Sequence, residues 1–190
     1  MQCFAMGLQI PESFGGRYFF DKSLDWEEHA GTTLRFLHYP PQNGDPDTPL
    51  AGSHTDYGSI TLLMQKDIPG LEVQAFRAQK NAPWVAAPVI PGTILVNIAD
   101  HLQMWTNGLL RSTKHRVMYN PEQQNRSRYS IACFIHSNDT TKLDPIESPL
   151  FTKEMRTEGV EFEEARNMTA GEYLDWRLSQ TYDYSKVPEE

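Results

Sequence analysis

Three side chains with the chemistry of metal ligands stand out in this chain: His54 and Asp56, separated only by Thr55, and the distant His115. Two imidazoles and one carboxylate can occupy one face of an iron(II) ion and leave the opposite face open, an arrangement typical of non-haem iron sites. Alternate residues of a β-strand project to the same side, so an extended segment from Gly52 to Asp56 would present His54 and Asp56 together, with Thr55 facing away. His115 must then reach the same interior surface from another strand.

The triplet alone is weak evidence. A His-x-Asp sequence occurs often by chance, and a single histidine such as His115 is more often a hydrogen-bonded structural residue than a metal ligand. A metal site at these three residues therefore needs support from the surrounding sequence.

A second pair, Arg128 and Ser130, has the same alternate spacing. The guanidinium of arginine grips a carboxylate with two parallel hydrogen bonds, and a neighbouring hydroxyl can donate a third. An arginine inside a barrel without an anion would be costly. The alternative is a surface arginine paired with a glutamate, but the alternation with Tyr129 and Ile131 favours a position on an inner wall.

Taken together, these residues resemble the iron(II)/2-oxoglutarate-dependent dioxygenases of the isopenicillin N synthase-like family, in the thymine hydroxylase-like branch of fungi and bacteria. The resemblance covers roughly residues 30 to 137. The motifs that carry it, in order, are Leu34–Pro41 (LRFLHYPP), Gly52–Leu63 (GSHTDYGSITLL), Pro69–Val73 (PGLEV), Trp105–Gly108 (WTNG), Ser112–Val117 (STKHRV) and Arg128–Ile131 (RYSI).

The resemblance implies iron(II) and dioxygen at one site, 2-oxoglutarate as co-substrate, and ascorbate as a stimulating reductant. The implied iron ligands are His54, Asp56 and His115, with no catalytic side chain beyond them. The implied 2-oxoglutarate contacts are Arg128, Ser130 and the hydroxyl of Tyr39. One departure is Leu37, which stands where many plant members have an asparagine and removes one co-substrate contact.

The implied reaction is the oxidation of a small organic metabolite, with hydroxylation as the expected outcome and succinate and carbon dioxide as by-products. Two alternatives stay open. An oxidase of the isopenicillin N synthase kind keeps the same arginine and serine without using 2-oxoglutarate, and a non-catalytic jelly-roll module would bind a ligand only. A zinc hydrolase is disfavoured because the chain lacks a His-Glu-x-x-His helix motif. The substrate is not specified by the sequence, and desaturation or ring closure stays open beside hydroxylation.

The elements that must position these residues are short strands separated by turn residues. The expected strands are residues 32–39, 50–56, 59–65, 71–75, 84–88, 93–98, 115–120 and 128–136. Eight such strands predict a mainly β protein with a jelly-roll (double-stranded β-helix) core and flanking N- and C-terminal helices.

Three regions are expected. Residues 1–31 are the remnant of an N-terminal helical region, residues 32–137 form the dioxygenase core, and residues 138–190 form a C-terminal extension. A helix is expected over about residues 170–182, begun by a capping box of Thr169 and Glu172. Leu174, Leu178 and Tyr182 recur every four residues and should pack on the barrel.

Some residues receive structural assignments. Asp100 is expected to cap a short helix that runs to Thr106. His29, His101 and His136 are expected at the surface or at caps.

The composition of the chain limits the classes of partner that it is expected to bind. The chain has 190 residues, a net charge of −8 and no run of Lys or Arg, which argues against nucleic acid. Two distant cysteines and no membrane-length apolar segment or signal peptide fit a reducing cytoplasmic location, with no membrane partner. The chain is short at its N-terminus relative to the family it resembles, so uncovered apolar barrel surface is expected to favour self-association.

Overall fold

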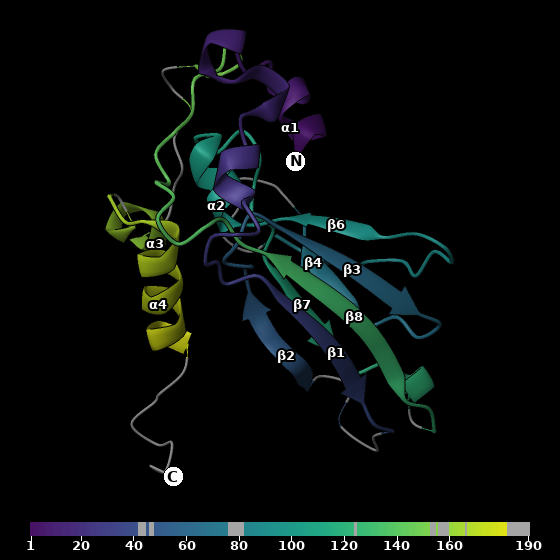
Figure 1. The fold of residues 1–190 in the computed structure, drawn as a ribbon. Helices are drawn as coiled ribbons and strands as arrows, with labels where there is room; N and C mark the ends of the chain where they lie inside the picture. Colours follow the sequence, from purple (N-terminus) through teal and green to yellow (C-terminus); the bar gives the residue numbers. More distant parts are fainter. Residues whose placement is uncertain are drawn as a thin grey trace.

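The computed structural model describes residues 1–41, 45, 48–75, 82–123, 125–152, 155, 160–165 and 167–181. Within these residues the eight expected strands are present and pair into two four-stranded antiparallel sheets (Figure 1). The first sheet has the order β1 (Thr33–Tyr39), β8 (Arg128–Ile135), β3 (Ile60–Lys66) and β6 (Leu95–Ile98). The second has the order β2 (Pro49–His54), β7 (His115–Met118), β4 (Leu71–Gln74) and β5 (Trp84–Ala86). The prediction of a mainly β protein with flanking helices is confirmed.

Strand β1 shows how the alternation of side chains builds the interior. Its register against β8 pairs Tyr39 with Arg128 and Leu37 with Ser130, and all four side chains line one cavity. Phe36, which precedes Leu37, lies on the other face of the strand, where it is 75% exposed. The two-residue period of a strand thus brings the predicted co-substrate residues to the inner wall.

Strand β2 ends earlier than expected. Its ladder with β7 closes at the pair His54 and His115, after a register shift, so Asp56 lies beyond the strand. The carbonyl of Asp56 instead accepts a hydrogen bond from the backbone N–H of Asp100. The prediction of a strand reaching Asp56 is therefore wrong, because the chain leaves the sheet to meet a helix.

The four α-helices of the described residues gather at one end of the two sheets (Figure 1). The α-helices are α1 (Gln2–Gly7), α2 (Asp100–Trp105), α3 (Val160–Glu164) and α4 (Ala170–Thr181). Short 3-10 helices are η1 (Glu12–Phe14), η2 (Gly16–Tyr18), η3 (Asp21–Leu24) and η4 (Pro121–Gln123). Phe20, Leu102, Trp105 and Tyr173 are buried in one apolar cluster that joins the N-terminal segment, α2 and α4 to the sheets.

The start of α4 has the predicted capping box. The Thr169 N–H donates to Glu172 Oε2 over 2.8 Å, and the Glu172 N–H donates to Thr169 Oγ1 over 3.4 Å. Leu174 and Leu178 line the cavity between the sheets, as the four-residue spacing indicated. The expected contact of Tyr182 lies outside the described residues.

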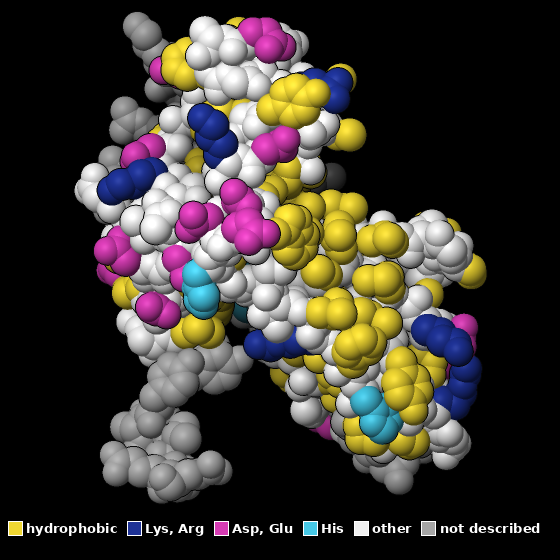
Figure 2. Space-filling view, in the orientation of Figure 1, with side chains coloured by type: hydrophobic (Ala, Val, Ile, Leu, Met, Phe, Trp, Pro, Cys, Tyr) yellow, Lys and Arg dark blue, Asp and Glu magenta, His cyan; other side chains and the backbone are white. Residues whose placement is uncertain are grey.

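The outer face of the first sheet is apolar. Leu34 and Phe36 of β1, Val96 of β6 and Tyr129 of β8 are each at least half exposed there, and Figure 2 shows hydrophobic side chains gathered over these strands. Among the described helices, none combines the length and the hydropathy that crossing a bilayer requires.

Candidate metal centre

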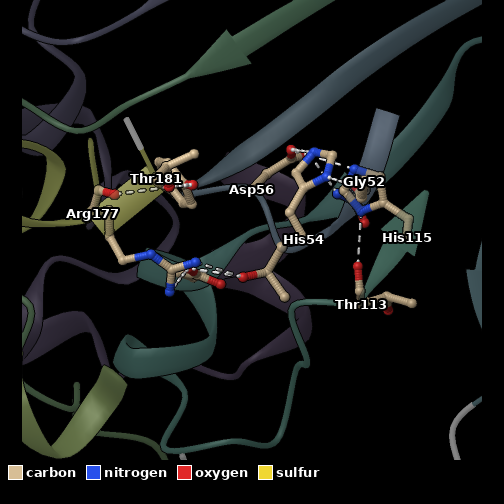
Figure 3. Close-up of polar contacts among 11 residues, drawn as sticks. Gly52, His54, Asp56, Thr113, His115, Arg177 and Thr181 are labelled. Atoms are coloured by element: carbon tan, nitrogen blue, oxygen red, sulfur yellow. Dashed lines mark hydrogen bonds and ion pairs between the residues drawn. The ribbon is translucent and has the colours of Figure 1, made fainter. Parts of the chain in front are cut away.

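The structure brings the three predicted ligands together (Figure 3). One ligand atom from each of His54, Asp56 and His115 lies within 4.8 Å of the others. Asp56 Oδ1 is 3.8 Å from His54 Nε2 and 3.5 Å from His115 Nε2. The two histidines are direct neighbours across β2 and β7, with ring centroids 4.4 Å apart. Three donors at these separations can surround one divalent cation.

Both imidazoles are oriented by main-chain carbonyls of their own segments. Nδ1 of His54 lies 2.7 Å from the carbonyl oxygen of Gly52, and Nδ1 of His115 lies 3.0 Å from that of Thr113. A carbonyl only accepts, so each Nδ1 carries the proton and each Nε2 has a free lone pair. This is the orientation that metal-binding histidines need.

Electrostatics favour the neutral form of His54, which is the form that can bind a metal. Burial lowers the pKa of His54, and the charge of His115 lowers it further, against opposing effects of the Gly52 carbonyl and Asp56. The Asp56 side chain is only 4% exposed, and its second oxygen accepts a hydrogen bond from Asn97 Nδ2 over 2.7 Å. One carboxylate oxygen is thereby held by the protein, and the other faces the two imidazoles.

The three ligands line a cavity of about 570 Å³ between the two sheets, which α4 borders through Leu174 and Leu178. Most of the exposed lining is apolar, with a few polar groups. A volume of this size accommodates small organic ligands.

Arg128 lines the same cavity, and its donors are incompletely used. The residue is 1% exposed, its Nη2 donates to Gln65 Oε1 over 3.2 Å, and its Nε and Nη1 have no protein acceptor among the described residues. The guanidinium lies 5.1 Å from the ring centroid of Tyr39. Burial lowers the pKa of Arg128, and Tyr39 opposes this effect. With the hydroxyl of buried Ser130 nearby on the same strand face, these donors fit a carboxylate group.

The family comparison agrees with this geometry. Residues 30–137 match the model of the 2OG-Fe(II) oxygenase superfamily. The chain belongs to this superfamily.

Among curated proteins, this chain is 40% identical over 188 residues to the UPF0676 protein C1494.01 of Schizosaccharomyces pombe. That match covers 97% of the chain and 52% of the yeast protein. The 2-oxoglutarate-dependent dioxygenase tropC of Talaromyces stipitatus is 38% identical over 116 residues, which cover 60% of the chain and 34% of tropC. The chain thus spans about half or less of the length of these relatives.

Solved structures give the same relationship. A full-length Neurospora crassa protein, solved in complex with alpha-KG, has a TM-score of 0.75 and 34% identity, covering 96% of this chain and 52% of the Neurospora chain. The complex of the same protein with alpha-KG and thymine has a TM-score of 0.76 and 33% identity, covering 96% of this chain and 51% of that one. Over almost the whole length of this chain, its sequence and fold therefore resemble about half of the Neurospora protein.

The sequence-based assignment of Asp100 as a helix cap is wrong. Asp100 is the first residue of α2 rather than its cap: the cap position is Ala99, and no side-chain cap bond is formed. The Asp100 carboxylate is instead fully buried and accepts a hydrogen bond from the Tyr173 hydroxyl over 2.8 Å. Two of its partners, Tyr173 and Arg177, belong to α4, and no local pattern around residue 100 indicates this contact.

Two of the three histidines expected at the surface or at caps, His101 and His136, are also buried instead. His29 is exposed, as predicted, and pairs with Asp139. His101 is fully buried, with Nδ1 3.2 Å from Ser137 Oγ, and His136 is also buried against it, with ring centroids 5.6 Å apart. Burial is the main cause that lowers the pKa of both His101 and His136, so both are neutral at pH 7.

Proposed function

We propose that this oxygenase binds iron(II) through His54, Asp56 and His115 and oxidises a small organic molecule by hydroxylation, with 2-oxoglutarate as co-substrate. The observation that supports the proposal most is the sharing of one cavity by the three converging donors and by the under-used guanidinium of Arg128. When bound, iron(II) and 2-oxoglutarate let dioxygen convert the co-substrate to succinate and carbon dioxide while the second oxygen atom oxidises the substrate.

The contribution of the protein to this chemistry is placement. His54 and His115 offer Nε2 lone pairs because main-chain carbonyls hold the opposite nitrogens. Asp56 supplies the compensating negative charge. Arg128 and Ser130 hold the distal carboxylate of 2-oxoglutarate, and the ring of Tyr39 packs on the guanidinium, with its hydroxyl available to the co-substrate.

The substrate is expected to be small and mainly apolar, because the cavity must hold it beside 2-oxoglutarate and most of the lining is apolar. Relatives suggest compounds to test. The Neurospora crassa protein was solved with thymine, and the rice Homoarginine-6-hydroxylase 2-ODD-233 is 40% identical over 132 residues, which cover 66% of this chain and 37% of that enzyme. A first panel contains small aromatic metabolites, which match the apolar lining, together with the more polar thymine and homoarginine, which the relatives suggest.

We also propose the organisation around this site. The two four-stranded sheets form a jelly roll, residues 32–137 form its core, and residues 1–31 and 138–190 flank it. The positions of β1 and β8 at the two ends of this range support these boundaries. Self-association through the apolar outer face of the first sheet is part of the same proposal, because exposed apolar patches of this kind promote association.

The test is succinate release by the purified chain under air, with iron(II), 2-oxoglutarate and ascorbate. We expect turnover that requires both iron and 2-oxoglutarate and that Asp56→Ala or His54→Ala abolishes. Gln74→Ala is the matched control and should retain activity, because the Gln74 side chain donates to the Ala82 carbonyl and does not line the cavity. Undiminished succinate release by Asp56→Ala would contradict the proposal.

Oxygen uptake separates the alternatives. Uptake that depends on an organic substrate but not on 2-oxoglutarate would identify an oxidase that draws all its electrons from that substrate. Failure to bind iron(II) at all would favour a non-catalytic module.

A further inference from the structure

A buried polar cluster lies on the side of the metal centre opposite to His115 (Figure 3). At its centre is the Asp100 carboxylate, which is fully buried. Asp100 Oδ2 accepts from the Tyr173 hydroxyl over 2.8 Å and from Thr55 Oγ1 over 3.2 Å, and it lies 3.4 Å from Arg177 Nη1. The side chain of Arg177 is 15% exposed, so the charge pair is largely shielded from solvent.

The cluster contacts each of the three residues that follow His54. Asp100 accepts the Thr55 hydroxyl with its side chain and donates its backbone N–H to the carbonyl of Asp56 over 2.9 Å. Arg177 Nη2 donates to Thr55 Oγ1 over 3.4 Å, and its guanidinium lies 4.4 Å from the ring centroid of Tyr57. Residues 55–57 are therefore held from outside the metal centre by two residues of other elements.

This segment needs such support. The ladder of β2 with β7 ends at His54, so Asp56 is not held by strand pairing. A backbone segment outside a sheet takes its geometry from other hydrogen bonds. The carboxylate of Asp56 must nevertheless stay within ligand distance of two imidazoles that are fixed on strands.

We propose that Asp100 and Arg177 are positioning residues that hold Thr55 to Tyr57 in the geometry that binds the metal. The inference rests on the proposed function, because it assumes that His54, Asp56 and His115 are the metal ligands. Thr55 is the link: its side chain bonds to both members of the pair, while its neighbours on either side are ligands.

The same pair connects the ligands to the cavity wall. Arg177 belongs to α4, whose Leu174, Leu178 and Thr181 line the cavity. The Thr181 hydroxyl also lies 2.5 Å from that of Tyr57. Helix α4, which borders the cavity, therefore contacts the segment that contains Asp56 through Arg177 and Thr181.

The test compares iron(II) affinity with fold stability. Iron(II) alone is titrated anaerobically into the full chain by calorimetry, for the wild type, Thr55→Val and Arg177→Gln. Thr55→Val removes the linking hydroxyl with little change in volume or charge. Thr55→Ser keeps the hydroxyl and serves as the rescue variant. Chemical unfolding of each metal-free protein reports stability separately.

Arg116→Gln is the matched control. Arg116 sits next to His115, pairs with Glu72 over 2.7 Å and lies 4.4 Å from the ring centroid of Trp84, so it too combines an ion pair with an aromatic contact. Within the described part of the chain, none of these side-chain contacts reaches residues 54–57.

We expect Thr55→Val and Arg177→Gln to raise the Kd for iron(II) by about 10-fold or more, the usual effect of losing a residue that supports metal ligands. Thr55→Ser and Arg116→Gln should stay within about twofold of the wild type, since both leave the link through Thr55 intact. Metal-free Thr55→Val should remain folded, so that its Kd reports ligand geometry. If Arg177→Gln does not fold, Thr55→Val decides alone, and a wild-type Kd in that variant overturns the inference.

The outcomes distinguish this inference from the proposed function. A wild-type chain that binds iron(II) without turning over 2-oxoglutarate, together with weak binding by Thr55→Val, contradicts the function and supports the positioning role. Normal turnover together with an unchanged Kd in Thr55→Val contradicts the positioning role alone. A wild-type chain that binds no iron(II) contradicts both.

Discussion

Asn97 Nδ2 donates a 2.7 Å hydrogen bond to Asp56 Oδ2, so that the other oxygen, Oδ1, faces Nε2 of both His54 and His115. Asn97 belongs to β6 of the first sheet, whereas the histidines belong to the second. The carboxylate therefore takes its orientation from one sheet and faces ligands on the other.

Replacing Asn97 by Leu should weaken metal binding. The leucine has a similar size but cannot donate, so the carboxylate of Asp56 is free to rotate. We expect the Kd for iron(II) to rise by about 10-fold in anaerobic titrations. Gln74→Leu, which removes a comparable amide from β4, should leave the Kd unchanged. Equal affinities for Asn97→Leu and the wild type would show that the amide does not orient the ligand.

Replacing Arg128 by Lys should weaken 2-oxoglutarate binding. Lysine keeps the charge but loses the planar pair of donors that matches a carboxylate. Loss of one hydrogen bond to a charged group costs about 1.5–3 kcal/mol, which corresponds to a rise of about 10- to 100-fold in the KM for 2-oxoglutarate.

The matched control is Arg35→Lys, at the more exposed arginine that also lines the cavity. Measuring succinate release against 2-oxoglutarate concentration for both variants identifies the arginine that holds the co-substrate. A larger rise in KM for Arg35→Lys than for Arg128→Lys would reverse the assignment.

Gly58→Ala should destabilise the fold near the metal centre. A Cβ at Gly58 would overlap the backbone carbonyl oxygen of Ile135 and approach the ring of His136, and neither β8 nor the buried ring can easily move. Forced overpacking of this kind costs about 1–3 kcal/mol, measurable by urea unfolding. Gly52→Ala meets no atom within 4 Å and should change stability by less than about 0.5 kcal/mol. Comparable losses in the two variants would rule out the steric explanation.

His136 should make stability depend on pH. Burial lowers its folded-state pKa from 6.5 to about 4, against opposing effects of Asp56 and Asp139. Between these values the unfolded chain binds the proton more readily than the folded one, so stability is complete above about pH 6.5 and falls as the pH drops toward 4. The loss should approach, at most, about 3 kcal/mol.

The measurement is urea unfolding from pH 4 to 7 for the wild type, His136→Gln and His38→Gln. The slope of the unfolding free energy against pH should decrease in His136→Gln and persist in His38→Gln, because His38 is exposed on β1 and contacts Ser127 rather than the groups around His136. An unchanged slope in His136→Gln would assign the pH dependence to other groups, of which buried His101 is the first candidate.

The strands were predictable because their signals are local. Alternating side chains and turn residues placed all eight, and the spacing of Arg128 and Ser130 correctly indicated one inner wall. The end of β2 was not predictable in the same way. Where the chain leaves the sheet, the carbonyl of Asp56 accepts a hydrogen bond from the backbone N–H of Asp100. The sequence around Asp56 does not indicate a partner so far along the chain.

The convergence of the ligands was also predictable, whereas their supports were not. The sequence indicated that His54, Asp56 and His115 share one surface, and the structure places them so. Asn97 and the pair of Asp100 and Arg177 follow no motif, because their roles depend on how β6, α2 and α4 pack. An aspartate at the start of a helix suits a cap equally well, and only tertiary contacts with α4 distinguish the two roles.

The acceptors that orient the two imidazoles belong to the main chain at Gly52 and Thr113. Every amino acid carries that oxygen, so exchanging the side chain at position 52 or 113 does not delete the tautomer-setting bond. The orientation of the two imidazoles therefore tolerates side-chain substitutions at these two positions. Substitutions that reshape the cavity can therefore leave the Nε2 lone pairs of both proposed ligands available.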